Sequence, residues 1–368
     1  MIKFLIGTRA ELIKIFPIIK ELDKLRREYL IISTGQHNIN YLLKVFNIDK
    51  ERVLYLNSPK EGFLLSITRA LRFCSHSVIK IKKHQIINSK DLIVVHGDTL
   101  STVIATVGTK LRGCKVVHLE AGLRSWDLFE PFPEEISRNV VDFLSDILIT
   151  VSKESYKNIR KQFPWKRNVY MIGNTIIDAA LYAFNYNLEV ELPKEDYAIV
   201  SIHRHENLTK KWRLMRIVKI IKEASKMIRL YIFMYKNTKL ALQRFGLYKY
   251  LRNNKNIVIM RPLDYIRFIK WLANAKLLLT DGGSIQEESI VFRVPSIILR
   301  LKTERTEGLK TGLNYLSKLK VDPTISKIRG FLNGEYPKKV KNPYGKPGLT
   351  KKIVKILLSY DKSSSRVN

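Results

Sequence analysis

Short apolar runs alternate with amphipathic stretches along most of the chain. In the first half, the runs that predict strands are residues 3–7, 29–34, 91–97, 115–120, 147–152 and 168–173. The stretches that predict helices are residues 10–25, 64–83, 99–111, 134–144 and 153–162. Because Val- and Ile-rich runs of this kind are typical of strands buried on both faces, the pattern predicts a parallel sheet with helices on each side.

The same alternation starts again in the second half. The predicted strands there are residues 197–203, 230–235, 256–260, 276–281 and 295–300. The break lies near Gly173 and Asn174, and a polar stretch follows at 185–196. We therefore expect an α/β fold with two doubly wound Rossmann-like domains facing a central cleft, over residues 1–173 and 174–348.

The charge of the chain is strongly basic. Its 368 residues include 66 Lys or Arg and 33 Asp or Glu, for a net charge of +33. These cations are spread along the chain, without an arginine-rich arm or a helix-turn-helix, so no nucleic-acid partner is predicted. An anionic substrate or a loose association with an anionic membrane surface is compatible with the charge.

Cysteine content and hydropathy limit the class of protein further. Cys74 and Cys114 do not form a C-x-x-C pair, and the sequence has no apolar run of 18 residues. These observations argue against a disulfide framework and a transmembrane helix, and they fit a cytoplasmic protein.

One short segment reverses the overall charge. From residue 120 to 146 the chain has seven acidic residues and two basic ones, Arg124 and Arg138. Within it, the sequence PFPEE at 131–135 has two prolines that fix the approach to a helix beginning near Glu134. The carboxylates are either a solvated helix face or groups for acid–base chemistry. Glu135, Asp142 and Asp146 are expected to be ordinary helix and loop charges.

Polar residues that directly follow strands are the candidates for chemistry, because ligands of such sheets bind at the carboxyl ends of the strands. These groups are residues 7–9, 36–37, 96–99, 120–122, 203–206 and 281–284. Asp98 is either the N-cap of the next helix or a chemical group, whereas Glu120 is less easily explained as a cap. His96 and His118 lie inside apolar strands and are expected to be hydrogen-bonded core residues.

Two glycine-containing turns have the form of phosphate sites. Gly282 and Gly283 follow a strand, and Ser284 starts a helix whose free N–H groups would attract an anion. The alternative is a plain turn in which Ser284 is the N-cap. The turn GTRAE at 7–11 has the same form, with Arg9 able to bind a phosphate. The H-x-H pair at 203 and 205 predicts no metal site, because alternate strand residues diverge and no third ligand is near.

The motifs, taken together, resemble one family. They are VHGDT (95–99), HLEAGLR (118–124), PFPEE followed by Arg138 and Asn139, IGNTIIDA (172–179), HRHEN (203–207), DGGSIQEE (281–288) and TER (303–305). Their order and spacing resemble those of the non-hydrolysing UDP-N-acetylglucosamine 2-epimerases of bacteria and archaea. The likeness runs from GTRAELIK at 7–14 to the NPYG sequence at 342–345.

The resemblance implies a fold and an activity. The fold is the glycosyltransferase-B type, in a homodimer, with a last helix at about 349–360 that packs back on the first domain. The activity is the interconversion of UDP-N-acetylglucosamine and UDP-N-acetylmannosamine, by elimination of UDP to a 2-acetamidoglucal followed by re-addition. The UDP-sugar is the implied ligand, with no metal and no nicotinamide cofactor.

The resemblance also implies roles for individual residues. The catalytic positions are Asp98, Glu120, Glu134 and His203. The positions that bind the UDP-sugar are Arg9, Lys14, Arg138, Phe268, Gly282, Gly283, Ser284, Glu288 and Arg305. The carboxylates would move protons and His203 would support the diphosphate. Glu288 would hold the ribose, Phe268 would pack on uracil, and Arg305 would help to bind UDP.

The chain departs from the family pattern at several positions. They are Ala10, Ile39, His205, Tyr235, Leu263, the order DGGS at 281–284 and the sequence NPYGKP at 342–347. In bacterial members several of these positions serve a second, activating UDP-N-acetylglucosamine. The alternatives that stay open are an epimerase for a related UDP-sugar such as a 2,3-diacetamido uronic acid, a hydrolysing 2-epimerase, a glycosyltransferase of the same fold, and a non-enzymatic basic binding protein.

Overall fold

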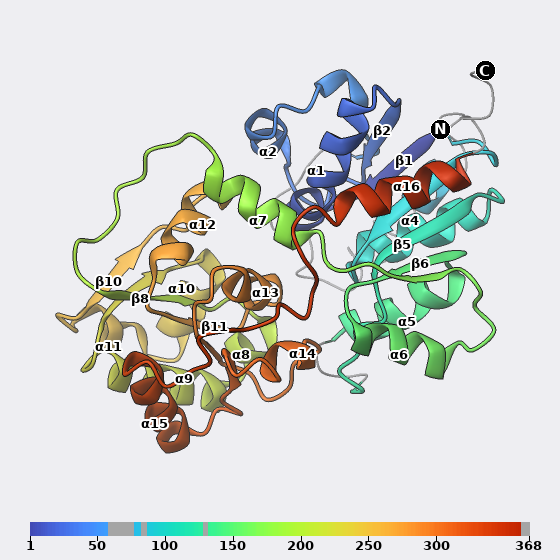
Figure 1. Ribbon diagram of the computed structural model, residues 1–368. Coiled ribbons are helices and arrows are strands. Elements are labelled where there is room, and N and C mark those ends of the chain that lie inside the picture. Colours follow the sequence, from blue (N-terminus) through green and yellow to red (C-terminus); the bar gives the residue numbers. More distant parts are fainter. Residues whose placement is uncertain (58–76, 82–86, 128–131, 362–368) are drawn as a thin grey trace. The chain divides into compact units, whose positions relative to one another are not determined.

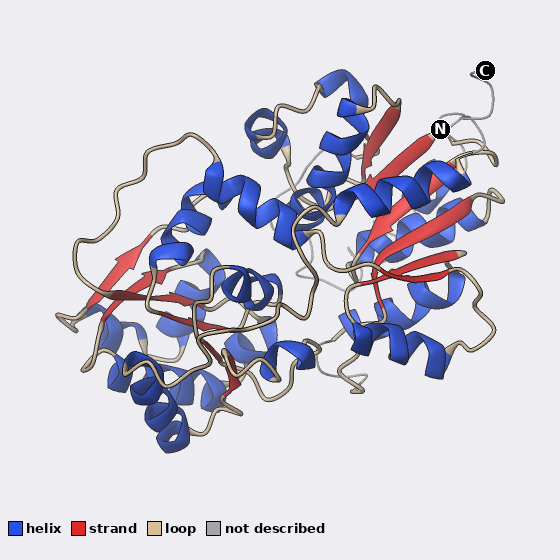
Figure 2. Cartoon of the chain, viewed as in Figure 1, coloured by secondary structure: helices blue, strands red, loops and turns tan. Residues whose placement is uncertain are grey.

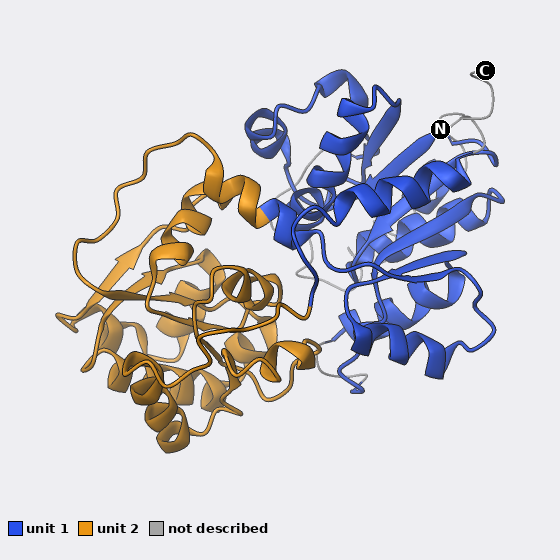
Figure 3. Ribbon diagram, viewed as in Figure 1, with its two compact units in different colours: residues 1–179, 344–368 blue, residues 180–343 orange. Residues whose placement is uncertain are grey.

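The computed structural model describes residues 1–57, 77–81, 87–127 and 132–361. The chain divides into two compact units, residues 1–179 with 344–368, and residues 180–343 (Figure 3). Each unit has one parallel sheet with helices on both faces (Figure 2), as the alternating pattern predicts. No helix in the described ranges is long and apolar enough to span a bilayer.

Unit 1 is built on a seven-stranded sheet in the order β3-β2-β1-β4-β5-β6-β7 (Figure 1). Its strands are β1 (Ile2–Ile6), β2 (Tyr29–Ser33), β3 (Val53–Tyr55), β4 (Leu92–His96), β5 (Lys115–Ala121), β6 (Ile147–Thr150) and β7 (Val169–Met171). Its helices are α1 (Arg9–Lys24), α2 (Asn40–Val45), the 3₁₀ turn η1 (Lys50–Arg52), α4 (Leu100–Lys110), α5 (Glu134–Leu144), α6 (Lys153–Gln162) and α16 (Thr350–Tyr360). Helix α7 (Ile176–Asn185) continues from unit 1 into unit 2.

Unit 2 has a six-stranded sheet in the order β10-β9-β8-β11-β12-β13. Its strands are β8 (Tyr197–Ser201), β9 (Arg229–Phe233), β10 (Ile257–Met260), β11 (Leu277–Thr280), β12 (Ser296–Ile298) and β13 (Asn314–Leu316). Its helices are α8 (His205–Thr209), α9 (Lys211–Ala224), α10 (Lys236–Arg244), α11 (Tyr248–Arg252), α12 (Tyr265–Asn274), α13 (Ser284–Val291), α14 (Thr306–Leu309) and α15 (Val321–Leu332).

Each sheet contains one point at which the direction of strand addition reverses. In unit 1 it lies between the neighbours β1 and β4, and in unit 2 between β8 and β11. In each sheet, the connections that follow the two neighbouring strands run to opposite faces of that sheet. The carboxyl ends of the two strands therefore remain accessible. The sequences that follow them are GTR, HGDT, HRHE and DGGS, the same polar groups that the sequence analysis selects.

The eleven strands that the apolar runs predict are confirmed, with ends that differ by at most two residues. The short edge strands β3 and β13 were missed. The predicted helix at 64–83 lies largely outside the described residues.

The last helix, α16, packs on α1 within unit 1. Asp178 accepts hydrogen bonds from the N–H groups of Gly348 and Thr350 at the start of α16.

A buried polar network lies behind β5. His118 is fully buried, as predicted for a core histidine, with Nδ1 2.7 Å from Asp142 and Nε2 2.8 Å from the Gly97 carbonyl. Asp142 also accepts hydrogen bonds from Arg124, at 2.7 Å, and from the Gly122 N–H. The prediction that Asp142 is an ordinary helix charge is therefore wrong: its carboxylate fixes the HLEAGLR turn after β5.

The charge of Asp142 is stabilised inside the protein. Desolvation raises the pKa of this carboxyl, but the Arg124 guanidinium and His118 more than offset it and hold the pKa below its ordinary value. A carboxyl with a lowered folded-state pKa stabilises the fold above its unfolded-state pKa, and that contribution is lost as the pH falls.

We expect Asp142→Asn to destabilise unit 1 by about 3–5 kcal/mol at pH 7, because it leaves Arg124 buried without its anion. Urea unfolding followed by circular dichroism measures this loss. The difference from the unsubstituted protein should shrink as the pH falls from about 4, where the carboxyl of the unfolded chain becomes protonated, toward the lower folded-state pKa. Asp146→Asn, at a partly exposed ion pair with Lys110, is the control and should cost about 1 kcal/mol or less. Equal losses for the two variants would contradict the role given to the network.

Candidate active site

Glu120 is the central residue at the open edge of the unit 1 sheet. It lies near the end of β5 with a positive φ of 69° and is only 8% exposed. Its Oε1 pairs with the buried Lys14 ammonium of α1 and accepts a hydrogen bond of 3.1 Å from Asn174. A left-handed backbone is rare for a residue other than glycine, asparagine or aspartate, and such strain is concentrated at functional sites.

His96 is the neutral neighbour of this pair. Its Nδ1 lies 3.9 Å from Glu120 Oε2, and the side chain is 3% exposed. Burial lowers the pKa of His96 to about 3, although the Glu120 carboxylate raises it. The imidazole is therefore uncharged at neutral pH, and Lys14 supplies the positive charge that balances Glu120.

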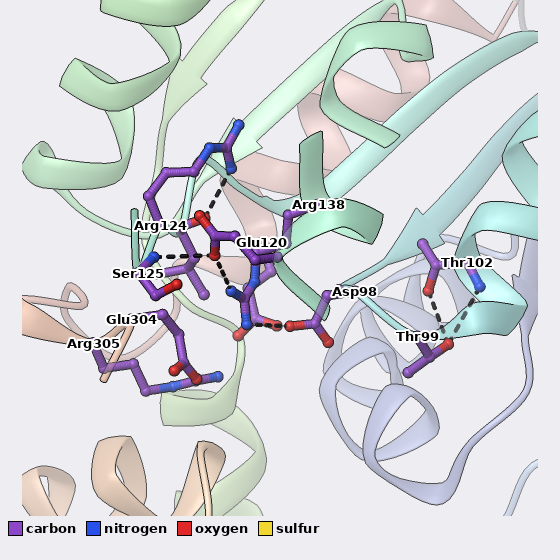
Figure 4. A network of polar contacts seen from close by, with 12 residues as sticks. Asp98, Thr99, Thr102, Glu120, Arg124, Ser125, Arg138, Glu304 and Arg305 are labelled. Carbon is purple, nitrogen blue, oxygen red and sulfur yellow. Dashed lines mark hydrogen bonds and ion pairs between the residues drawn. The ribbon is translucent and has the colours of Figure 1, made fainter. Parts of the chain in front are cut away.

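Asp98 belongs to a second polar group at the same edge (Figure 4). Its carboxylate is 2.5 Å from the Arg138 guanidinium, which also donates to Glu135 at 2.7 Å. The N-cap of α4 is Thr99, whose hydroxyl accepts from the Thr102 N–H. The capping alternative for Asp98 is therefore wrong, and a quarter of its side chain stays exposed.

The glutamates of PFPEE have different environments. Helix α5 begins at Glu134, as predicted, and the Glu134 side chain is half-buried. Glu135 is 1% exposed and accepts hydrogen bonds from Arg138 and from the Ser125 N–H. The prediction that Glu135 is only a helix N-terminal charge is wrong, because it orients Arg138 and ties the 125–127 loop to α5. Pro131 lies outside the described residues.

The turn GTRAE is closed by its own glutamate. Glu11 accepts hydrogen bonds from the N–H groups of Gly7, at 2.6 Å, and Thr8, and from the Thr99 hydroxyl, at 2.5 Å. These two N–H groups therefore serve a capping box instead of an external anion. Burial raises the pKa of Glu11 to about 7. The T-x-x-E spacing was the signal that could have identified this role. Arg9 lies at the surface and donates to the Asn38 carbonyl.

In unit 2, the buried Asp281 organises the loop after β8. Its carboxylate accepts hydrogen bonds from the His203 and Arg204 N–H groups, at 2.9 and 3.1 Å, and from the Asn207 side chain. The His203 ring lies 5.2 Å from the Tyr235 ring. Desolvation lowers the pKa of His203, and the Asp281 carboxylate opposes this shift. With its pKa below the ordinary value, the His203 ring is largely uncharged at pH 7, and 42% of its side chain is exposed.

Two arginine side chains, those of Arg204 and Arg305, lie beside the DGGS turn. Gly283 is the N-cap of α13 and Ser284 is its first residue, without a side-chain cap, so the alternative of an N-cap serine is wrong. A Cβ built on Gly283 would lie 2.8 Å from Arg305 and 3.3 Å from Arg204. Two guanidinium groups beside a helix N-terminus favour a phosphate. Arg204 was among the strand-end candidates at 203–206, but it was given no role in binding the UDP-sugar.

The remaining predicted residues of unit 2 lie on α12, α13 and the segment before α14. Glu288 is 4% exposed, and burial together with its carboxylate raises the pKa of Tyr265. Phe268 is half-buried, with its ring 5.7 Å from that of Phe233. Arg305 donates a hydrogen bond to Glu287 at 2.9 Å and pairs with Glu304.

Across the described ranges, no three His, Cys, Asp or Glu side chains are grouped to hold a metal ion.

Comparison with known proteins assigns the chain to a family. The family model described as UDP-N-acetylglucosamine 2-epimerase matches residues 20–358. The chain is 34% identical to the UDP-N-acetylglucosamine 2-epimerase of Methanocaldococcus jannaschii, over 97% of this chain and 98% of that protein. It is 30% identical to the enzyme of the same name from Methanococcus maripaludis, over 98% and 99% of the two chains.

A solved structure agrees with these relatives over the same length. The crystal structure of the M. jannaschii UDP-GlcNAc 2-epimerase in complex with UDP-GlcNAc and UDP has a TM-score of 0.85 and 30% identity, and the match covers 97% of this chain and 99% of that one. On these grounds, the chain belongs to the UDP-N-acetylglucosamine 2-epimerase family.

Proposed function

We propose that this protein is a non-hydrolysing UDP-N-acetylglucosamine 2-epimerase that interconverts UDP-N-acetylglucosamine and UDP-N-acetylmannosamine. The observation that carries the proposal is the buried Glu120, held at a strained strand end by Lys14 and Asn174. Family membership and a relative solved with UDP-GlcNAc and UDP support the same substrate.

The residues of unit 2 would bind the UDP moiety. The N-terminus of α13, at Gly283 and Ser284, would accept the diphosphate, with Arg204 and Arg305 supplying positive charge. Gly282 allows this approach, since a Cβ there would lie 3.0 Å from the His203 ring. The neutral His203 would donate a hydrogen bond to the diphosphate as negative charge develops on it.

The acidic residues of unit 1 would carry out the proton transfers. In the first step, a carboxylate removes the C2 proton while the C1–O bond breaks and UDP leaves with the electron pair. In the second, a UDP oxygen re-adds to C1 and a proton is delivered to the opposite face of C2. Asp98, Glu120 and Glu134 are the groups available for these transfers. Lys14, Arg138 and Arg9 would position them and the phosphate.

The proposal includes the oligomeric state and the cellular location of the protein. The protein would form a homodimer in the cytoplasm and would associate to some extent with anionic lipid. The basic charge supports the last of these.

Incubation with UDP-N-acetylglucosamine in heavy water tests the reaction. We expect proton spectra to show deuterium at C2 together with UDP-N-acetylmannosamine, because the C2 proton is removed and replaced from solvent. Release of free N-acetylmannosamine and UDP would identify a hydrolysing enzyme instead. Absence of C2 exchange, with and without additional UDP-N-acetylglucosamine as an activator, would exclude the proposed activity.

Glu134→Gln should keep the fold and the affinity for UDP but slow C2 exchange by about 100-fold or more, the usual contribution of a general acid or base. Circular dichroism, UDP titration calorimetry and deuterium exchange measure the three properties. Glu154→Gln, in the first turn of α6, is the matched control and should exchange at the normal rate. Normal exchange by Glu134→Gln would remove Glu134 from the catalytic residues.

Arg204→Ala should weaken UDP binding by about 10- to 100-fold, because a charge-assisted hydrogen bond contributes about 1.5–3 kcal/mol. Titration calorimetry with UDP measures the change, and Arg329→Ala on the exposed side of α15 is the control. An unchanged affinity in Arg204→Ala would show that the diphosphate does not bind at the start of α13.

A further inference from the structure

Although the cations are spread along the chain, one stretch of unit 2 has very few acidic residues among them. Residues 207–263 contain fifteen Lys or Arg and a single acidic residue, Glu223, which gives this stretch a net charge of +14 in a chain of +33. Glu223 pairs with Lys226 at 2.7 Å. The structure folds the stretch into α9, α10 and α11 with the strands β9 and β10.

The three helices α9, α10 and α11 cover the same side of the unit 2 sheet. Their inward residues, among them Ile217, Leu242 and Leu251, belong to one buried apolar cluster. Hydrogen bonds from Asn254 and Asn256 to Ser225 join the end of α9 to the chain that follows α11. We name the outward residues of these three helices the basic face; α15 packs on α9 beside it.

The basic face also exposes large apolar side chains. Five such side chains are exposed in unit 2, and four of them lie here: Trp212 (43%), Met215 (49%), Leu240 (53%) and Tyr250 (61%). The solvent-facing residues of α9 are Lys211, Trp212, Met215, Arg216, Lys219 and Lys222, and the exposed Lys226 follows in the turn after the helix. Arg213 and Arg216 lie over the Trp212 ring, at 5.4 and 5.3 Å from its centroid.

An open hollow of about 660 Å³ connects α9 with α11 on this face. It is lined by Lys222, Lys249, Lys255 and Tyr250, together with Gly246, Asn253 and Asn254. No acidic side chain lines it. Three ammonium groups and a tyrosine around a shallow hollow fit a phosphate group at the surface of a larger assembly.

We propose that the basic face docks on an anionic phospholipid surface. The lysines and arginines would bind the headgroup phosphates, with one headgroup in the hollow at Lys222, Lys249 and Lys255. Trp212, Met215, Leu240 and Tyr250 would enter the interface between headgroups and acyl chains. Exposed tryptophan and methionine among cations are typical of helices that lie in a membrane interface. This docking rests on the lipid association proposed above, for which it names the surface, and it does not depend on the catalytic activity.

The apolar side chains favour lipid over nucleic acid as the occupant. A duplex would need polar side chains placed for backbone phosphates and bases, and Met215 and Leu240 have no partner there. A bilayer offers both a negative surface potential for the cations and an apolar layer for the four exposed side chains.

Vesicle sedimentation of the full chain tests the docking. We expect binding to vesicles of equal parts phosphatidylglycerol and phosphatidylcholine, weak binding to phosphatidylcholine alone, and a loss of binding as the salt concentration rises. The fluorescence of the protein should shift to the blue on binding, and Trp212→Phe should lose this shift. The triple variant Lys222→Glu, Lys249→Glu, Lys255→Glu should bind at least about 100-fold more weakly, since each basic residue near such a surface contributes about five-fold.

The control is the triple variant Lys153→Glu, Lys157→Glu, Lys161→Glu. It changes the net charge equally, at three exposed positions of α6 in unit 1. It should bind more tightly to the vesicles than the variant in the basic face. Equal weakening by the two variants would mean that only the total charge matters and would overturn the proposal. So would an absence of vesicle binding at low salt, or binding to duplex DNA or RNA by a protein that does not bind vesicles. All variants should have the circular dichroism spectrum and the rate of C2 exchange of the unsubstituted protein. A loss of vesicle binding can therefore be distinguished from a failure of the proposed epimerase activity.

Discussion

The arrangement of the two parallel sheets is the constraint on which the rest of the structure depends. In each sheet the strand order reverses once, between β1 and β4 and between β8 and β11. A parallel strand must be followed by a crossover to the other end of the sheet, so its carboxyl end can carry polar side chains without a hairpin blocking them. The residues Arg9, Asp98, His203, Arg204 and the turn at 282–284, which are proposed to act in catalysis or phosphate binding, follow these strands.

Charges at these strand ends are held by other charges, because water does not reach most of them. Glu120 is paired with Lys14, and Asp142 with Arg124 and His118. Arg138 joins Asp98 to Glu135. Buried pairs of this kind contribute little net stability, since desolvation offsets their attraction. Their effect is to fix the positions and the ionisation states of the carboxylates that face the open edge of the sheet.

The acidic segment at 120–146 and the basic face of unit 2 have separate proposed functions. The carboxylates between residues 120 and 146 are divided into a buried framework, formed by Glu135 and Asp142, and the more accessible Glu134. Fifteen of the 66 Lys and Arg residues lie in the stretch 207–263, which forms α9, α10 and α11, and α15 packs on α9. With its single acidic residue, this stretch supplies +14 of the net charge of +33.

The sequence by itself determined eleven of the thirteen described strands, the helices α1, α4, α5 and α6 and the strand-end motifs. It could do so because apolar periodicity and the polar residues after each strand are local signals. It also gave the family resemblance that the comparisons confirmed. The tertiary structure decided which carboxylates are buried. The partners of Glu135, Asp142 and Glu11 lie 3 to 88 positions away, and Asp98 meets Arg138 40 positions along the chain. The long-range pairs, Glu11 with Thr99, Asp98 with Arg138 and Asp142 with Arg124, depend on how the helices pack on the sheet, and local sequence does not record them.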